Sequence, residues 1–144
     1  MGAIYKVTDD GEGDLMLQPI VVNQTETNWE RGNGTIAATD WIDTSEGFSC
    51  PFYINRALGL CQVTLTMKFK SGVTYTSQKV LISGLPKAKS MHTSCGVISS
   101  LQGMIDFTTS GTIRTGNVWT GSSSVGGGWL VVSATYVIDD SERY

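Results

Sequence analysis

The stretch Leu60-Cys61-Gln62-Val63-Thr64-Leu65-Thr66-Met67-Lys68-Phe69-Lys70 alternates apolar and polar residues without a break. Successive side chains of a β-strand point to opposite faces, so this stretch predicts a long strand with one apolar and one polar face. A shift of one residue would move the whole apolar face into water, so the register is strongly determined. The rest of the chain has to provide a second layer that covers the apolar face.

Shorter strand candidates, separated by turn-forming residues, lie on both sides of this stretch. They are residues 36–38, 41–42, 48–54, 79–83, 97–101, 103–109, 111–114, 117–120 and 129–138. The segment 48–54 is expected to pair with the long strand across the turn at Asn55-Arg56-Ala57. No window of about a dozen residues shows helical periodicity. The pattern predicts an all-β protein, an antiparallel β-sandwich or jelly-roll-like head with a short N-terminal stem.

Residues 1–35 are expected to form an N-terminal stem or attachment segment with its linker, and residues 36–144 the β-sandwich head domain. A chain of 144 residues can bury a core without metal or disulfide support. The acidic run 9–14 lacks the spacing of a calcium loop, which favours a solvated turn. No apolar run is long enough to span a bilayer and no secretion signal is present, so membrane insertion is not expected.

Cys50, Cys61 and Cys95 form neither a CxxC pair nor an even set. This favours buried thiols in a reducing compartment. A Cys50–Cys61 disulfide across neighbouring strands is the alternative that the sequence leaves open. No metal or other cofactor is expected.

The net charge of −3 is unevenly distributed along the chain. No acid occurs between residues 47 and 105, where the basic residues are Arg56, Lys68, Lys70, Lys79, Lys87 and Lys89. One interpretation is a solvated sheet face on which lysines discourage edge pairing, and it is favoured for Lys68 and Lys70. The other is a basic surface for an anionic ligand or for the acidic segment of another copy. The sequence pI of about 5.0 and the lack of a basic stripe with interleaved aromatics argue against nucleic acid as a partner.

Catalytic motifs are not found in this sequence. His92 is the one histidine, and it lies in a Ser/Thr-rich segment that favours a surface loop. The nucleophile-elbow, Walker and dinucleotide-binding patterns are absent from the sequence. We therefore expect no catalytic residues and no enzymatic activity.

Four tryptophans point instead to binding, because aromatic faces stack on sugar rings or fill protein interfaces. Trp41 and Trp129 are expected in the core, whereas Trp119, beside a Ser/Gly-rich segment, is expected to be exposed. The candidate ligand-binding residues combine a stacking surface with hydrogen-bond donors in loops or short strands. They are Trp119, Arg114, Asn117 and His92.

Several segments resemble, in their order along the chain, the receptor-binding tips of phage tail fibres and baseplates. These are Trp41-Ile42-Asp43, the long strand from Leu60, Leu81-Ile82-Ser83-Gly84-Leu85-Pro86 and Trp129-Leu130-Val131-Val132-Ser133-Ala134-Thr135-Tyr136. The likeness covers about residues 41–138 and concerns layout, not a diagnostic motif. The family's Leu-Pro turn usually continues Gly-Tyr-x-Pro, whereas this chain continues Lys87-Ala88-Lys89-Ser90. The loop after Pro86 is therefore expected to contact something different.

The resemblance implies a non-enzymatic homotrimer of β-sandwich heads that adsorbs a phage to a bacterial host by binding a cell-surface saccharide or protein. It places the protein in the phage tail of the virion, assembled in the host cytoplasm, with other tail or baseplate proteins bound through the N-terminal segment. A trimer would cover the second, half-apolar face of residues 129–138. The basic, acid-free centre of the chain would suit anionic cell-wall polymers. The alternatives are a virion structural protein, such as a capsid-decoration or head-fibre protein, and a glycan depolymerase.

Overall fold

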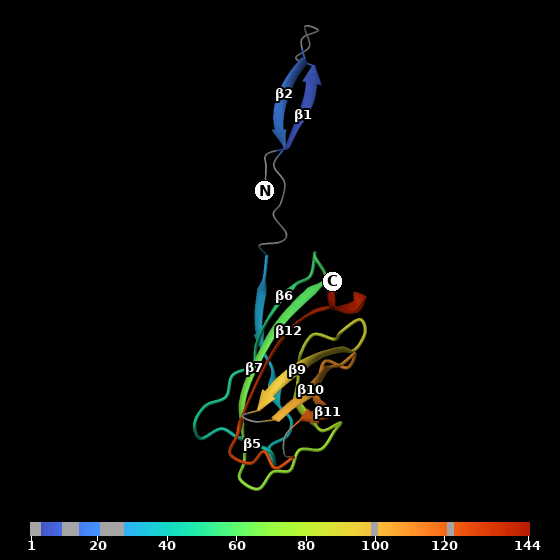
Figure 1. Ribbon diagram of the computed structural model, residues 1–144. Helices are drawn as coiled ribbons and strands as arrows, with labels where there is room; N and C mark the ends of the chain where they lie inside the picture. Colours follow the sequence, from blue (N-terminus) through green and yellow to red (C-terminus); the bar gives the residue numbers. More distant parts are fainter. Residues whose placement is uncertain (1–3, 10–14, 21–27, 99–100, 121–122) are drawn as a thin grey trace.

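The protein is an all-β structure, as the sequence predicts. The computed structural model describes residues 4–9, 15–20, 28–98, 101–120 and 123–144. Within these residues the strands form one 2-stranded sheet and one 10-stranded sheet. All pairings are antiparallel, and the larger sheet curls into a nearly closed, barrel-like sandwich (Figure 1).

The 2-stranded sheet consists of β1 (Ile4–Asp9) and β2 (Leu15–Ile20). The strands of the larger sheet are β3 (Glu30–Asn33), β4 (Thr35–Ile36), β5 (Ile42–Asp43), β6 (Pro51–Asn55), β7 (Leu60–Phe69), β8 (Val80–Ser83), β9 (His92–Ile98), β10 (Leu101–Phe107), β11 (Ile113–Thr120) and β12 (Trp129–Val137). Their order across the sheet is β3-β6-β7-β12-β9-β10-β11-β8-β4, with β5 on β7. A short 3₁₀ helix, η2 (Asp140–Glu142), follows β12.

The long strand β7 is the centre of one wall of the barrel. Its apolar face is buried as predicted, and the side chains of that face expose 2% or less of their area: Cys61, Val63, Leu65, Met67 and Phe69. On one side β7 pairs with β6 from Phe52↔Val63 to Asn55↔Leu60, which confirms the pairing expected across the turn. On the other side it pairs with the whole of β12 (Figure 1).

Gly34 lies where the two ends of the larger sheet come together. The segment before it, β3, pairs with β6, whereas β4 immediately after it pairs with β8 at the other end of the sheet. An added Cβ at Gly34 would lie 2.5 Å from Cγ2 of Ile82 and 2.8 Å from Sγ of Cys50. Only glycine lets one continuous stretch of chain approach both sheet ends this closely.

The strands on the far side of the barrel differ from the prediction in their bounds. The predicted strand at 97–101 spans the end of β9 and the start of β10, because β9 already begins in the polar segment at His92. The predicted pieces 111–114 and 117–120 belong to one strand, β11. Cys50 and Cys61 are buried free thiols, but Cys95 is exposed, against the expectation of burial, because residues 95 and 97 of β9 point outward.

The N-terminal segment contains β1 and β2, which pair from Ile4↔Ile20 to Asp9↔Leu15. The acidic turn predicted at 9–14 lies, from residue 10 on, outside the described residues. The larger sheet includes Glu30–Asn33, which we assigned to the linker on sequence grounds. The division at residue 35 between stem and head stays a prediction.

The strand β12 has one buried and one open face. Leu130, Val132 and Tyr136 point into the core, and the Tyr136 hydroxyl donates a hydrogen bond to the carbonyl of Pro86 at 2.7 Å. On the outer face Val131 and Val137 expose 48% and 54% of their area, and Val97, paired with Val131, exposes 49%. The described part of the chain therefore leaves the second face of this strand open. Trp41 packs against the core as expected, edge to face with Phe69 at 6.1 Å. Trp129, also expected in the core, is only half-buried, because it lies on the face of β12 opposite the buried Leu130.

Candidate ligand-binding groove

A groove runs over the outer surface of the barrel where β8, β10 and β11 lie side by side. It consists of two hollows of about 270 Å³ and 210 Å³ that share Gln78, Met91 and Arg114. We call it the Arg114 groove. Its lining residues are Ser77, Gln78, Val80, Met91, Thr93, Met104, Asp106, Thr108, Thr109, Ser110, Thr112, Arg114, Gly116 and Asn117.

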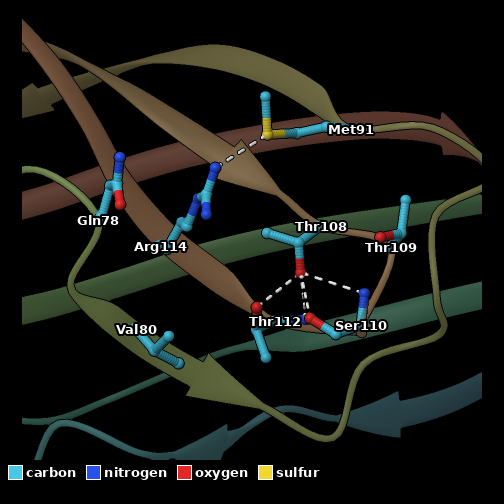
Figure 2. A pocket seen from close by; sticks show the side chains of 8 residues that line it. All are labelled: Gln78, Val80, Met91, Thr108, Thr109, Ser110, Thr112 and Arg114. Carbon is cyan, nitrogen blue, oxygen red and sulfur yellow. Dashed lines mark hydrogen bonds between the residues drawn. The ribbon is translucent and has the colours of Figure 1, made fainter.

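Arg114 lies at the junction of the two hollows, between Gln78 and Met91 (Figure 2). Its Nε donates a hydrogen bond to Oδ2 of Asp106 at 3.1 Å, and its Nη2 donates to the sulfur of Met91 at 3.3 Å. Oδ1 of Asp106 accepts a hydrogen bond from the Thr93 hydroxyl at 3.0 Å. The Asp106 side chain is only 10% exposed, against 32% for Arg114. The carboxylate is therefore a fixed, buried partner, and the guanidinium is the group that faces the groove.

A β-bulge brings Asn117 into the same groove as Arg114. Residues three apart on a regular strand point to opposite faces. Ile105 pairs with Thr115 and Gly103 with Val118, so Met104 alone faces both Gly116 and Asn117. The extra residue restores Asn117 to the face of Arg114, as bulges commonly do near binding sites. A Cβ at position 116 would lie 3.0 Å from Cβ of Met104 and 3.2 Å from Oδ1 of Asp106, so glycine leaves room there.

The segment that carries Gln78 is held rigidly against β11. Gln78 has a positive φ of 64°, which is uncommon for a residue other than glycine. Its N–H donates to the Thr115 carbonyl at 2.6 Å, and the Thr115 hydroxyl donates to Thr76 O at 2.6 Å and accepts from Lys79 N at 2.9 Å. Such strained conformations persist where the surroundings over-determine them and cluster at functional sites.

Tyr75 fixes the backbone behind the bulge. Its buried hydroxyl donates to the carbonyls of Met104 at 3.0 Å and Gly116 at 3.3 Å. Burial raises the pKa of Tyr75 to about 12, so the hydroxyl remains a donor at neutral pH. The bulge and the loop at 76–79 are thus both fixed before any ligand arrives.

One end of the groove presents hydroxyl groups. Thr108 Oγ1 lies 2.9 Å from Ser110 Oγ and 2.6 Å from Thr112 Oγ1, and the three hydroxyls gather in one cluster (Figure 2). Val80 and Met91 add exposed apolar surface beside these polar groups.

The structure brings together two of the four residues predicted for the site. Arg114 and Asn117 line the groove. His92 lies in β9, not in a loop, and pairs with the buried Phe107, 6.2 Å between ring centroids. It therefore belongs to the inner face of β9, whereas Thr93 faces the groove. Trp119 is part of β11, but its side chain lies outside the described residues.

Sequence reasoning missed Asp106, Gln78 and Met91. A signal for Asp106 was present, because it is a charged residue between the apolar Ile105 and Phe107, and acids are rarely buried without a partner. Gln78 and Met91 gave no such signal. Both reach the groove through loop geometry that periodicity does not encode.

The chemical groups that line the groove are suited to holding a ligand. Of its lining residues, Asp106 is the one acid, and both of its oxygens already accept hydrogen bonds. The remaining groups are hydroxyls, amides, a guanidinium and apolar side chains, which hold a ligand but supply no activated nucleophile. Among the described residues, no three or more His, Cys, Asp or Glu side chains gather as metal ligands would. The absence of enzymatic activity stays a prediction.

Four of the six basic residues of the acid-free centre form ion pairs with acids from other parts of the chain. Ion pairs join Arg56 to Glu30 at 3.1 Å, Lys68 to Glu46 at 2.8 Å, Lys79 to Asp40 at 2.8 Å and Lys89 to Asp140 at 3.5 Å. The fold thus compensates a charge separation that the linear sequence exaggerates. Exposed pairs of this kind add little stability.

The structure defines an all-β, barrel-like domain with a polar groove on its outer surface. Comparisons of the chain with protein-family models, with curated proteins and with solved structures found no match. The described part of the chain contains no helix with the length and apolar character that a membrane crossing requires.

Proposed function

We propose that this protein is a non-enzymatic phage tail receptor-binding protein whose head binds a bacterial surface glycan in the Arg114 groove. The observation that carries the proposal is the guanidinium of Arg114, anchored through Nε on the buried Asp106 and open toward the groove. Its fork of N–H donors stands among hydroxyl and amide groups that both donate and accept hydrogen bonds. The segments that resemble phage tail tips supply the biological setting.

The groove matches the surface of a sugar in two respects. Thr109, Gln78 and Asn117 offer hydrogen bonds to ring hydroxyls, and the apolar surfaces of Val80 and Met91 suit the C–H faces of a ring. The rigid support from Thr115 and Tyr75 lowers the entropy that ordering the site would cost on binding. Adsorption requires binding without turnover, and the groove residues fit this requirement.

The test is a screen of the full chain on an array of bacterial glycans, followed by calorimetric titration of the glycan that binds. In Arg114→Lys the charge stays but the planar fork is lost, so the affinity for that glycan should fall about tenfold. The matched control is Arg31→Lys on β3, where the cation lies 5.9 Å from the Tyr53 ring and outside the groove. Its affinity should equal that of the wild type.

Three results would contradict the proposal. Equal affinities of wild type and Arg114→Lys would move the binding site away from the groove. A protein that binds no glycan and no host cell, but binds other virion proteins, would favour the structural alternative of a decoration or head-fibre protein. Release of sugars from host envelopes would indicate a depolymerase.

A further inference from the structure

We infer that the Arg114 groove selects an uncharged saccharide, not an anionic cell-wall polymer. This inference rests on the proposed function and names the ligand class of the same site. Arg114 is the one cation among the lining residues, and Asp106 is the one anion. The two are bound to each other at 3.1 Å, so the groove carries no net charge.

The buried carboxylate weakens attraction for an anion. A phosphate or carboxylate about 4 Å from the guanidinium would lie roughly 7 Å from Asp106, so repulsion cancels more than half of the attraction. Asp106 cannot turn away, because Thr93 and Arg114 hold both of its oxygens. An anion would also lose hydration on entering the groove, which the remaining attraction has to offset.

The basic residues around the groove add little positive electrostatic potential to it. Lys79 and Lys89 have acidic partners in Asp40 and Asp140. Lys87 lies near Gly111, at the hydroxyl-rich end, but does not line the groove. Its charge acts on Asp139 and helps to keep the pKa of that carboxyl below its usual value, after the larger contribution of hydrogen bonds from Ser141. The basic centre predicted from the sequence is therefore not a basic surface at the groove.

A neutral sugar fits the groups that remain. The guanidinium N–H groups that donate no hydrogen bond to a described residue can donate to sugar oxygens. The hydroxyls of Thr109 and Ser110 and the amides of Gln78 and Asn117 can pair with sugar hydroxyls in either direction. None of these interactions depends on a charge on the ligand.

The experiment measures how salt and polyanions affect the binding of the full chain to the glycan found on the array. Affinity should change less than about twofold between about 50 and 500 mM NaCl, because neutral contacts are not screened. Polyphosphate and hyaluronan should not compete at about 100-fold excess, whereas the neutral glycan itself should. Thr109→Lys adds a cation at the rim without touching the ion pair, and it should create salt-sensitive polyphosphate binding.

Three outcomes would overturn the inference. An anionic glycan as the ligand, or a fall in affinity of about tenfold over the same salt range, would refute it and leave glycan binding itself intact. So would competition by polyphosphate with the wild type. Binding to no glycan at all would instead remove the proposed function and this inference with it.

Discussion

Cys50 and Cys61 lie in the core as free thiols, and burial raises the pKa of each to about 11. An ordinary thiol titrates at 9.0, so between pH 9 and 11 the unfolded chain binds fewer protons than the folded protein. The free energy of unfolding therefore falls as pH rises through this window, and the stabilisation is complete below it. At pH 10 the loss should be about 1 kcal/mol for each thiol.

Urea unfolding at pH 8 and pH 10 would measure this loss. The Cys50→Ala/Cys61→Ala double variant should begin less stable, because it leaves cavities, but should lose about 2 kcal/mol less than the wild type on raising the pH. Cys95→Ala, at an exposed position, should keep the wild-type pH dependence. Tyr75 and Tyr136 also have raised pKa values. Cys61 and Cys50 contribute to the raised pKa of Tyr136, but burial is the larger cause and persists in the double variant, so the folded tyrosine stays protonated at pH 10 in all three proteins. Equal losses in wild type and double variant would contradict the assignment.

At single residues, prediction from sequence succeeded where the alternation of apolar and polar neighbours decides whether a side chain is buried. From Cys61 to Phe69 apolar residues alternate with polar ones along β7, and the five apolar side chains of that face are buried. It failed where a segment distant in the sequence decides whether a charged side chain is buried or paired. Asp106 is buried because Arg114 and Thr93 satisfy it, and Lys79 is neutralised by an acid 39 positions away. Interactions between residues so distant in the sequence produce no periodic pattern from which they could be predicted.

At the scale of elements, the closure of the barrel depends on Gly34. Gly34→Ala would place a methyl group 2.5 Å from Ile82 Cγ2, so the ends of β6 and β8 would have to move apart. We expect a loss of about 1–3 kcal/mol in the free energy of unfolding, as for other overpacked cores. Urea denaturation of Gly34→Ala beside Thr39→Ala, an exposed control, would measure it.

A double-mutant cycle would distinguish the contact with Ile82 from general strain at Gly34. Removing the Ile82 side chain in Gly34→Ala/Ile82→Ala relieves the clash, so the two losses should not add. Additive losses would show that the contact with Ile82 is not the cause.

Some strands were predicted correctly from the sequence, whereas the bounds of others were wrong. The hairpin of β6 and β7 was found because a turn separates two apolar segments, and its pairing is the expected one. The bounds of β9 were missed because its first residues are polar, and β11 was divided because a bulge at Gly116 and Asn117 interrupts the alternation. The same bulge joins Asn117 to Arg114, so the feature that hid the strand also forms the groove.

At the scale of the whole molecule, we propose that the outer face of β12 is the surface through which a trimer would form. Val131 and Val97 are cross-strand neighbours on this face, and both are about half exposed. Large contiguous apolar patches mark surfaces that associate, and in a trimer these valines would contribute to one. The homotrimer that the resemblance implies would bury these valines of β9 and β12 around its axis.

Light scattering at micromolar concentration should give about three times the chain mass of 15.5 kDa. Val131→Lys places a charge that would have to be desolvated in the interface, so this variant should have the mass of one chain and an unchanged circular dichroism spectrum. Ser71→Lys, in the exposed turn after β7, adds the same charge elsewhere and should remain trimeric. A wild type with the mass of one chain would refute the trimer. A trimeric Val131→Lys would move the interface away from β12, and the exposed valines would then await another partner.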